Sequence, residues 1–216
     1  MTNEQFEFRM PNTPLNLAVL ISGSGTTLQN LIDEIAAGRL NARIVAVVGS
    51  REGLKGIDRA MAAHLPTHII NPRECPSSAA FSEKVFSICR EAKADLVVMA
   101  GWLCLLDLPG DFAGKAMNIH PALLPSFGGK GMYGPRVHQA VIDHGCKITG
   151  CTVHFVDGSY DTGPIIIQRT CEVRDGDTAV SLASRVFEEE KIAYPEAIRL
   201  FQQSKLQIDG RRVRIS

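Results

Sequence analysis

The alternation of short apolar runs with segments of helical period constrains this fold most strongly. Asp95–Ala100 is an almost wholly apolar run of strand length, which is typical of a strand with both faces covered. Elsewhere apolar residues recur at helical spacing, as at Leu28, Leu31 and Ile35. The alternation predicts βαβ units and therefore an α/β fold with a largely parallel sheet.

The elements can be placed along the chain from this pattern. We predict strands at Leu15–Ser22, Ile44–Val48, Thr67–Ile70, Asp95–Ala100, Ala116–Ile119, Ile148–Val156 and Ile165–Val173. The main helices are predicted near Ile57–His64, Ser78–Ala92, Pro135–His144 and Thr178–Gln203, with another beginning at a Thr26–Gln29 capping box. Leu206–Ile215, around Asp209-Gly210, predicts a hairpin.

Length and charge limit the classes of function. The 216 residues suit one domain, predicted at 15–216 behind a polar tail at 1–14. With 23 basic and 23 acidic residues, the chain has no net field that would attract nucleic acid or a membrane. The N-terminus lacks the pattern of a secretory signal, and every apolar stretch is too short to span a bilayer. We therefore predict a soluble, cytoplasmic protein.

Cysteine and histidine spacing does not indicate a metal centre. The six cysteines contain no C-x-x-C pair, and several lie inside apolar runs. His64 and His68 are four residues apart, but Pro66 breaks any helix that they could share. The sequence therefore predicts reduced core thiols and no metal site.

A glycine-rich turn, Ser22–Thr27, lies between a predicted strand and a predicted helix. The free N–H groups of a helix start favour an anion, so the turn could bind phosphate. It is neither a Walker loop, because no Lys follows the glycines, nor G-x-G-x-x-G, because Leu28 takes the last position. An ordinary tight turn remains the alternative.

Three polar residues carry the strongest chemical signal. Asn118 and His120 lie on the same side of a predicted strand, where an amide and an imidazole could stabilise an oxyanion. Asp161 lies at the same predicted sheet edge and would raise the pKa of His120 if the two side chains are close. His154 is interpreted as a supporting residue, and Asp157 as a residue that turns the loop. A lone histidine is otherwise more often structural.

Glu190 is informative because it falls on the apolar stripe of the last helix, four residues after Val186. A buried carboxylate needs a partner. That partner could be a substrate amine or a structural cation such as Arg185, and the sequence leaves both open.

Taken together, five motifs resemble the glycinamide ribonucleotide formyltransferase family over most of the chain. In order they are Ile21–Gln29 (ISGSGTTLQ), Met99–Leu103 (MAGWL), Asn118–Pro125 (NIHPALLP), Gly150–Val156 (GCTVHFV) and Tyr160–Ile166 (YDTGPII). Singly each is a modest signal, but this order and spacing are specific. The resemblance implies a Rossmann-like, mostly parallel, seven-stranded sheet with helices on both faces.

The resemblance also implies an activity and site residues. The enzyme would transfer the formyl group of 10-formyltetrahydrofolate, as co-substrate, to the amine of glycinamide ribonucleotide in purine biosynthesis. Asn118, His120 and Asp161 would be catalytic. The ribonucleotide would contact Gly25, Thr26, Thr27, Phe187 and Glu190. The folate would contact Leu103, Cys104, Leu105, Leu106, Asn118, Asp157, Gly158, Ser159, Tyr160 and Asp161. Some members carry an Arg where Cys104 stands, and the loop Phe127–Gly134 resembles only a subset of the family.

Two other functions remain as alternatives. A formyltetrahydrofolate hydrolase shares the Asn-x-His and Asp elements, but it carries an extra N-terminal regulatory domain. A non-catalytic binding module would need the glycine turn alone. The presence of all three polar residues favours the enzyme.

Overall fold

The computed structural model of the protein describes residues 13–216, so residues 1–12 of the predicted tail lie outside the described part. The strands are β1 (Leu15–Ile21), β2 (Ala42–Gly49), β3 (Thr67–Ile69), β4 (Leu96–Met99), β5 (Ala116–His120), β6 (Ile148–Phe155), β7 (Ile165–Glu172), β8 (Leu206–Asp209) and β9 (Arg212–Ile215). The helices are α1 (Thr26–Ala36), α2 (Lys55–Ala62), α3 (Ser78–Glu91), α4 (Pro135–Asp143) and α5 (Ala179–Gln202).

The strands form one sheet in the order β3-β2-β1-β4-β5-β6-β7-β9-β8. Strands β1 to β5 pair with one another in parallel, whereas β6 is antiparallel to both β5 and β7. The described sheet has nine strands, so the predicted number of seven was wrong. The two extra strands are those of the C-terminal hairpin, which joins the sheet where Ile165 pairs with Arg212.

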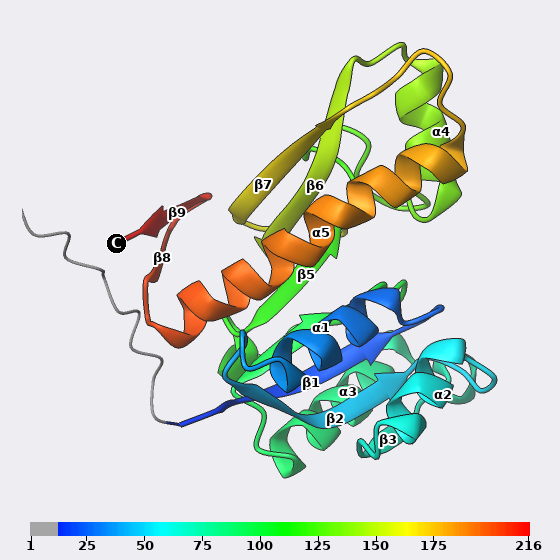
Figure 1. Cartoon of the computed structure of the whole chain (residues 1–216). Helices are drawn as coiled ribbons and strands as arrows, with labels where there is room; N and C mark the ends of the chain where they lie inside the picture. The colour runs from blue at the N-terminus through cyan, green and yellow to red at the C-terminus, as the bar shows by residue number, and fades with distance from the viewer. Residues whose placement is uncertain (1–12) are drawn as a thin grey trace, which may run out of the picture.

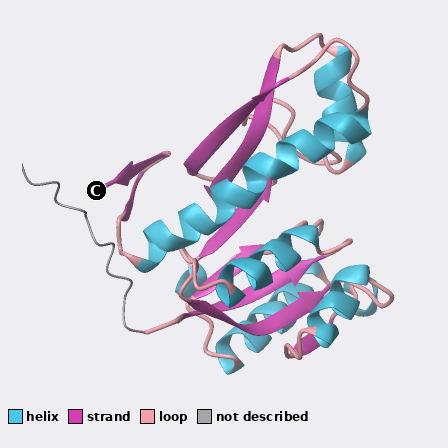
Figure 2. Ribbon diagram, in the orientation of Figure 1, coloured by secondary structure: helices cyan, strands magenta, loops and turns pink. Residues whose placement is uncertain are grey.

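Alternation along β1 explains why the sheet is covered on both faces. Leu17, Val19 and Ile21 pack into one core cluster with α1 and α5, whereas Ala18 and Leu20 pack into a second cluster with α3. The strand therefore reads as a continuous apolar run, as expected for a central parallel strand. Figure 1 shows α1 and α5 on one side of the sheet and α3 behind it, and Figure 2 shows the same helical layers by secondary structure.

The start of α1 differs from the prediction. Gly25 is the N-cap residue, with a left-handed φ of 72°, and no side chain caps the helix. The predicted capping box was wrong because the side chain of Gln29 instead donates a hydrogen bond to Asp33 and accepts one from Arg59. A capping box does occur at α5, between Thr178 and Ser181. No helix within residues 13–216 is long and apolar enough to cross a membrane.

Candidate functional site

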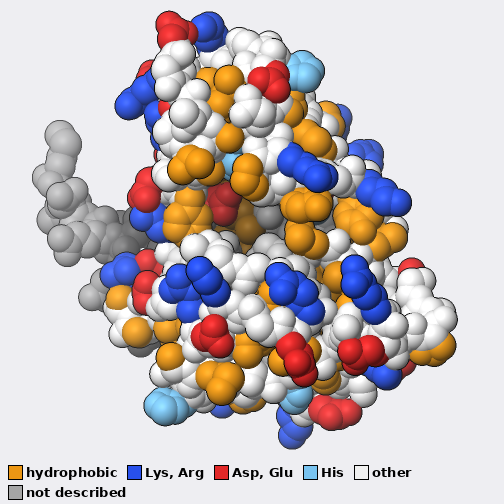
Figure 3. Space-filling view, turned by 90° about the vertical axis from the view of Figure 1, so that its right-hand side faces the viewer, with side chains coloured by type: hydrophobic (Ala, Val, Ile, Leu, Met, Phe, Trp, Pro, Cys, Tyr) orange, Lys and Arg blue, Asp and Glu red, His pale blue; other side chains and the backbone are white. Residues whose placement is uncertain are grey.

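A cavity of about 810 Å³ opens at the carboxyl ends of β1, β4 and β5. Ligands bind in α/β proteins at this edge of the sheet. The cavity is lined by the turns that follow β1 and β4, the end of β5, the loop between β5 and α4, and one face of α5. Figure 3 shows the hollow, with hydrophobic side chains inside it and Lys and Arg side chains along its rim.

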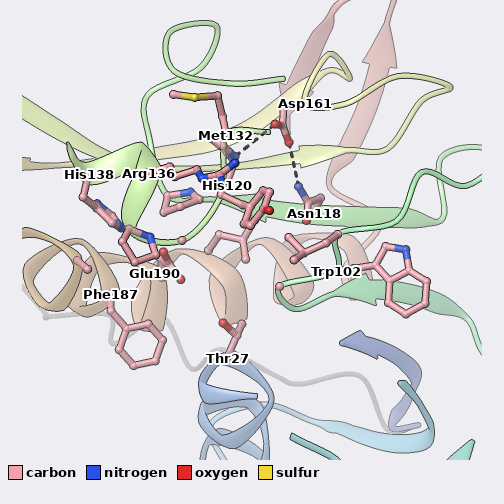
Figure 4. Close-up of a pocket in the computed structure, with 18 of the residues that line it drawn as sticks. Thr27, Trp102, Asn118, His120, Met132, Arg136, His138, Asp161, Phe187 and Glu190 are labelled. Atoms are coloured by element: carbon pink, nitrogen blue, oxygen red, sulfur yellow. Dashed lines mark hydrogen bonds and ion pairs between the residues drawn. The ribbon is translucent and has the colours of Figure 1, made fainter. Parts of the chain in front are cut away.

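The three residues predicted to be catalytic meet in this cavity (Figure 4). Nδ1 of His120 lies 3.4 Å from Oδ2 of Asp161, and Nδ2 of Asn118 donates to Oδ1 of Asp161 at 3.3 Å. Asn118 and His120 share one side of β5 because side chains alternate along a strand. The carboxylate of Asp161 therefore lies between an amide and an imidazole.

The return of the chain from β6 to β7 places Asp161 at this point. Asp161 itself adopts a left-handed φ of 56°. Two residues later the backbones pass so closely that a Cβ on Gly163 would lie 1.8 Å from the carbonyl oxygen of Phe155. The Asp-Thr-Gly motif thus combines the carboxylate with the glycine that the tight return requires.

His154 supports Asn118 from the neighbouring strand, where the two residues are paired in register. Nδ1 of His154 lies 2.8 Å from the carbonyl oxygen of Phe155, so this nitrogen carries the hydrogen and Nε2 accepts. Nδ2 of Asn118 lies 3.2 Å from Nε2 and donates to it. The two amide hydrogens of Asn118 are therefore directed at His154 and Asp161.

The electrostatics of the pair depend on burial. Burial lowers the pKa of His120 below its ordinary value, although the charge of Asp161 and the carbonyl of Phe127 oppose the shift. The predicted increase in the pKa of His120 was therefore wrong, because desolvation outweighs the attraction of the carboxylate. Burial alone would raise the pKa of Asp161, but the adjacent imidazoles and the N–H of Gly129 keep it lowered.

The glycine turn lies at the far end of the same cavity. Thr26 and Thr27 line it at the first turn of α1, a helix with no acidic side chain in that turn. Arg59 braces the turn from α2 by donating through Nε to the carbonyl of Ser24 at 3.0 Å. The free N–H groups and the dipole of α1 make this end suitable for an anion.

Gly25 is needed for packing rather than for lining the cavity. A Cβ at Gly25 would lie 2.5 Å from Cα of Gly56, the second residue of α2. Because the backbones of Gly25 and Gly56 approach so closely, α2 packs directly against the turn that precedes α1. Gly56 completes the contact by donating its N–H to the carbonyl of Gly23 at 3.2 Å.

Glu190 and Phe187 project from α5 into the cavity. Arg185, the structural partner considered for Glu190, instead forms an ion pair with Asp177. Glu190 forms no ion pair or hydrogen bond with any of residues 13–216, and burial raises its pKa to about 7. An unpaired carboxylate remains, facing the space where a ligand would lie.

A second, smaller pocket of about 50 Å³ adjoins the first beside Asn118 and Asp161. Eight of the ten residues predicted to contact folate line it: Cys104, Leu105, Leu106, Asn118, Asp157, Ser159, Tyr160 and Asp161. Leu103 lines the larger cavity, and Gly158 lines neither. Asp157 turns the loop, as interpreted, by accepting from the N–H of Ser159 and the hydroxyl of Thr162.

Several lining residues were not given roles from the sequence. Trp102 borders both pockets, and Met132, Tyr133 and Arg136 form a wall of the larger one together with His138. The position of Trp102, directly before the predicted folate segment, was the available signal for it. No cluster of His, Cys, Asp or Glu within residues 13–216 could hold a metal ion.

The fold and this site define an α/β protein with a ligand cavity at the carboxyl edge of its sheet, and comparison with known proteins makes the assignment specific. The sequence model of the formyl transferase family matches residues 15–198, so the chain belongs to that family. Glycinamide ribonucleotide transformylase 1 from Symbiobacterium toebii is 40% identical, with a TM-score of 0.87 over 95% of each chain.

Two other proteins are similar to this chain. The trifunctional purine biosynthetic protein adenosine-3 of Gallus gallus is 37% identical over 93% of this chain. This chain spans only 20% of that protein's length. A formyltetrahydrofolate deformylase from Pseudomonas syringae is 20% identical, with a TM-score of 0.83 over 94% of this chain and 66% of its own. That likeness shows the fold alone.

Proposed function

We propose that the chain transfers the formyl group of 10-formyltetrahydrofolate to the amine of glycinamide ribonucleotide. The observation that carries the proposal is a single cavity with the start of helix α1 at one end and an unpaired carboxylate, Glu190, along its wall. The cluster of Asn118, His120 and Asp161 stands beside the second pocket. The name of the transformylase includes glycinamide ribonucleotide, and the name of the trifunctional relative includes purine biosynthesis.

Each part of the proposed ligand pair has a matching surface. The ribonucleotide phosphate would lie on the N–H groups of Thr26 and Thr27, and the amine end near Glu190 and Phe187. The folate heterocycle would enter the smaller pocket, whose wall carries Leu105, Leu106 and the turn at Asp157. The formyl carbon would then lie beside the cluster, where both pockets meet.

The protonation states suggest how the cluster acts. Because its pKa is lowered, His120 begins neutral and can accept a proton at Nδ1 as the amine attacks the formyl carbon. Asp161 faces that nitrogen and stabilises the resulting imidazolium. The new C–N bond forms, the bond to the folate nitrogen breaks, and the proton passes to the departing nitrogen. No covalent bond to the enzyme is needed.

Asn118 would supply a donor to the formyl oxygen as that oxygen gains negative charge. Its two amide hydrogens are directed at His154 and Asp161 at 3.2 and 3.3 Å. The longer of these hydrogen bonds, to Asp161, is the one that the formyl oxygen would replace. His154 would keep the amide group oriented during the exchange.

Absorbance measurements with glycinamide ribonucleotide and a 10-formyl folate analogue test the proposal. Release of the deformylated folate should depend on the amine, and Asn118→Ala should reduce turnover by roughly 10²- to 10³-fold. The matched control is Gln139→Ala, which removes an exposed amide from α4 that donates a hydrogen bond to Asp143. Amine-independent release would indicate a hydrolase, and binding without turnover would indicate a non-catalytic module; either result would refute the proposal.

A further inference from the structure

A backbone carbonyl contacts the imidazole of His120 on the side away from Asp161. Nε2 of His120 lies 2.8 Å from the carbonyl oxygen of Phe127, in the loop between β5 and α4. A carbonyl oxygen can only accept a hydrogen bond, so Nε2 must carry a hydrogen whether the ring is neutral or charged. Nδ1 is then the nitrogen at which His120 gains or loses a proton.

The same loop also holds Asp161. The N–H of Gly129 donates to Oδ2 of Asp161 at 2.9 Å, two residues beyond the carbonyl that faces His120. Phe127 adopts a left-handed φ of 54°, an uncommon conformation for a bulky residue that turns its carbonyl toward the ring. The loop thus makes one contact with each member of the pair.

Gly128 lies between these two contacts. A Cβ at this position would lie 2.5 Å from Cδ2 of Leu124 and 3.2 Å from Cβ of Asp161. Leu124 is itself buried, so its side chain has little room to move. We therefore expect a side chain at residue 128 to push the loop away from Asp161 and to draw the Phe127 carbonyl off His120.

We propose that Gly128 is a positioning residue. Its lack of a side chain allows the loop to approach Asp161 and His120 so closely that the Phe127 carbonyl holds His120 in the tautomer protonated at Nε2. The catalytic consequence rests on the proposed function, because only then is Nδ1 the atom that relays the amine proton. The tautomer itself does not depend on the identity of the substrates.

The charged and titratable neighbours of His120 make this control necessary. Asp161 faces the ring from the connection after β6, His154 from β6, and His138 from α4. Without the Phe127 carbonyl, Asp161 would favour a hydrogen on Nδ1, because a carboxylate accepts hydrogen bonds. Such a ring would leave its basic nitrogen facing the loop instead of the cavity.

Nitrogen NMR of the full chain labelled with ¹⁵N-histidine tests the tautomer directly. His120→Asn serves only to assign the His120 signals among those of the six histidines. At a pH where the ring is neutral, we expect Nε2 to be protonated and Nδ1 to be bare. A neutral ring protonated at Nδ1 in the wild-type protein would overturn the proposal without requiring any variant to fold.

Gly128→Ala tests the role of the glycine. We expect the His120 signals to move toward the Nδ1-protonated or averaged pattern, and kcat to fall by roughly 10- to 100-fold with KM for both substrates little changed. The control is Gly176→Ala, where a Cβ would meet nothing within 4 Å and φ is not left-handed. Circular dichroism and urea unfolding verify that both variants fold.

The outcomes separate this proposal from the proposed function. If the wild-type protein shows no amine-dependent transfer, the activity is refuted while the NMR result still decides the tautomer. If Gly128→Ala keeps both the wild-type tautomer and the wild-type kcat, the positioning role of Gly128 is refuted while the transferase remains.

Discussion

Nδ1 of His120 and Oδ2 of Asp161 lie 3.4 Å apart, and their side chains are only 4% and 10% exposed. Burial penalises the charged form of each group, whereas their mutual attraction favours both charges. For His120 the penalty is the larger effect, so its pKa is lowered. The pair can therefore hold a neutral imidazole beside a carboxylate, ready to accept a proton.

Asp161→Asn tests the attraction within this pair. Asparagine keeps an oxygen that can accept from Gly129 but removes the charge that raises the pKa of His120. The pKa of His120 should fall further, and the limb of the kcat/KM profile that reports it should move to lower pH. The rate should fall by about 10²-fold or more because the imidazolium loses its counter-ion.

The control for this measurement is Asp143→Asn, at the exposed end of α4, where the carboxylate accepts a hydrogen bond from Gln139. Its profile should match that of the wild-type protein. A limb in Asp161→Asn that stays in place or moves to higher pH would contradict the assignment of the limb to His120.

Glu190→Gln should change how stability depends on pH. Burial raises the pKa of Glu190 from 4.5 to about 7, so the folded state keeps a proton that the unfolded state has already released. The free energy of unfolding should therefore fall as the pH rises from about 4.5 to about 7. Above this window the variant should be more stable than the wild-type protein by on the order of 3 kcal/mol.

Urea unfolding at several pH values measures this difference without added substrate. The two proteins should be nearly equal in stability below about pH 4, where Glu190 is protonated in both states. Glu188→Gln, on the exposed side of the same helix, is the control for the loss of a carboxylate from α5. A constant difference across the whole pH range would contradict the half-buried, unpaired state of Glu190.

The sequence revealed the strands because buried parallel strands read as apolar runs. All seven predicted strands occur within one residue of their predicted bounds, except β2, which begins two residues earlier at Ala42. The number of strands in the sheet could not be predicted, because the hairpin joins it through a single pairing at Ile165. A contact of that kind leaves no periodic signal in the sequence.

Part of the site could likewise be predicted from the sequence, and part could not. Sequence position alone placed Glu190 on the buried stripe of α5, but only the structure shows that Arg185 pairs with Asp177. The charge of Asp161 was visible in the sequence, whereas the desolvation of His120, which decides the direction of its pKa, was not. The Phe127 carbonyl is a backbone group, and no residue type in the sequence indicates its contact with the ring.

Gly25→Ala should damage the turn that precedes α1. The new Cβ would lie 2.5 Å from Cα of Gly56, and φ at this position is 72°, so both sterics and backbone conformation oppose it. We expect a loss of about 1 to 3 kcal/mol in stability and weaker inhibition by inorganic phosphate. Gly23→Ala, in the same turn, is the matched control because a Cβ there meets nothing within 4 Å.

The comparison of these two glycines separates packing from phosphate contact. If Gly23→Ala destabilises the protein as much as Gly25→Ala, the close approach to Gly56 is not the cause. If Gly25→Ala folds with unchanged stability and unchanged inhibition by phosphate, the packing of α2 against the turn is not needed for binding an anion there.

Tyr194→Phe should loosen the sheet directly behind the cluster of Asn118, His120 and Asp161. Tyr194 is fully buried on α5, and its hydroxyl lies 3.0 Å from the carbonyl oxygens of both Met99 and Met117, on adjacent strands β4 and β5. One hydroxyl hydrogen is thus shared by two strands, and its loss should cost about 1 to 3 kcal/mol because the carbonyls stay buried. Met117 precedes Asn118, so kcat should fall more than KM changes. Urea unfolding and steady-state kinetics measure both effects, and a variant within about 0.3 kcal/mol of the wild-type protein would show that the sheet hydrogen bonds alone satisfy these carbonyls.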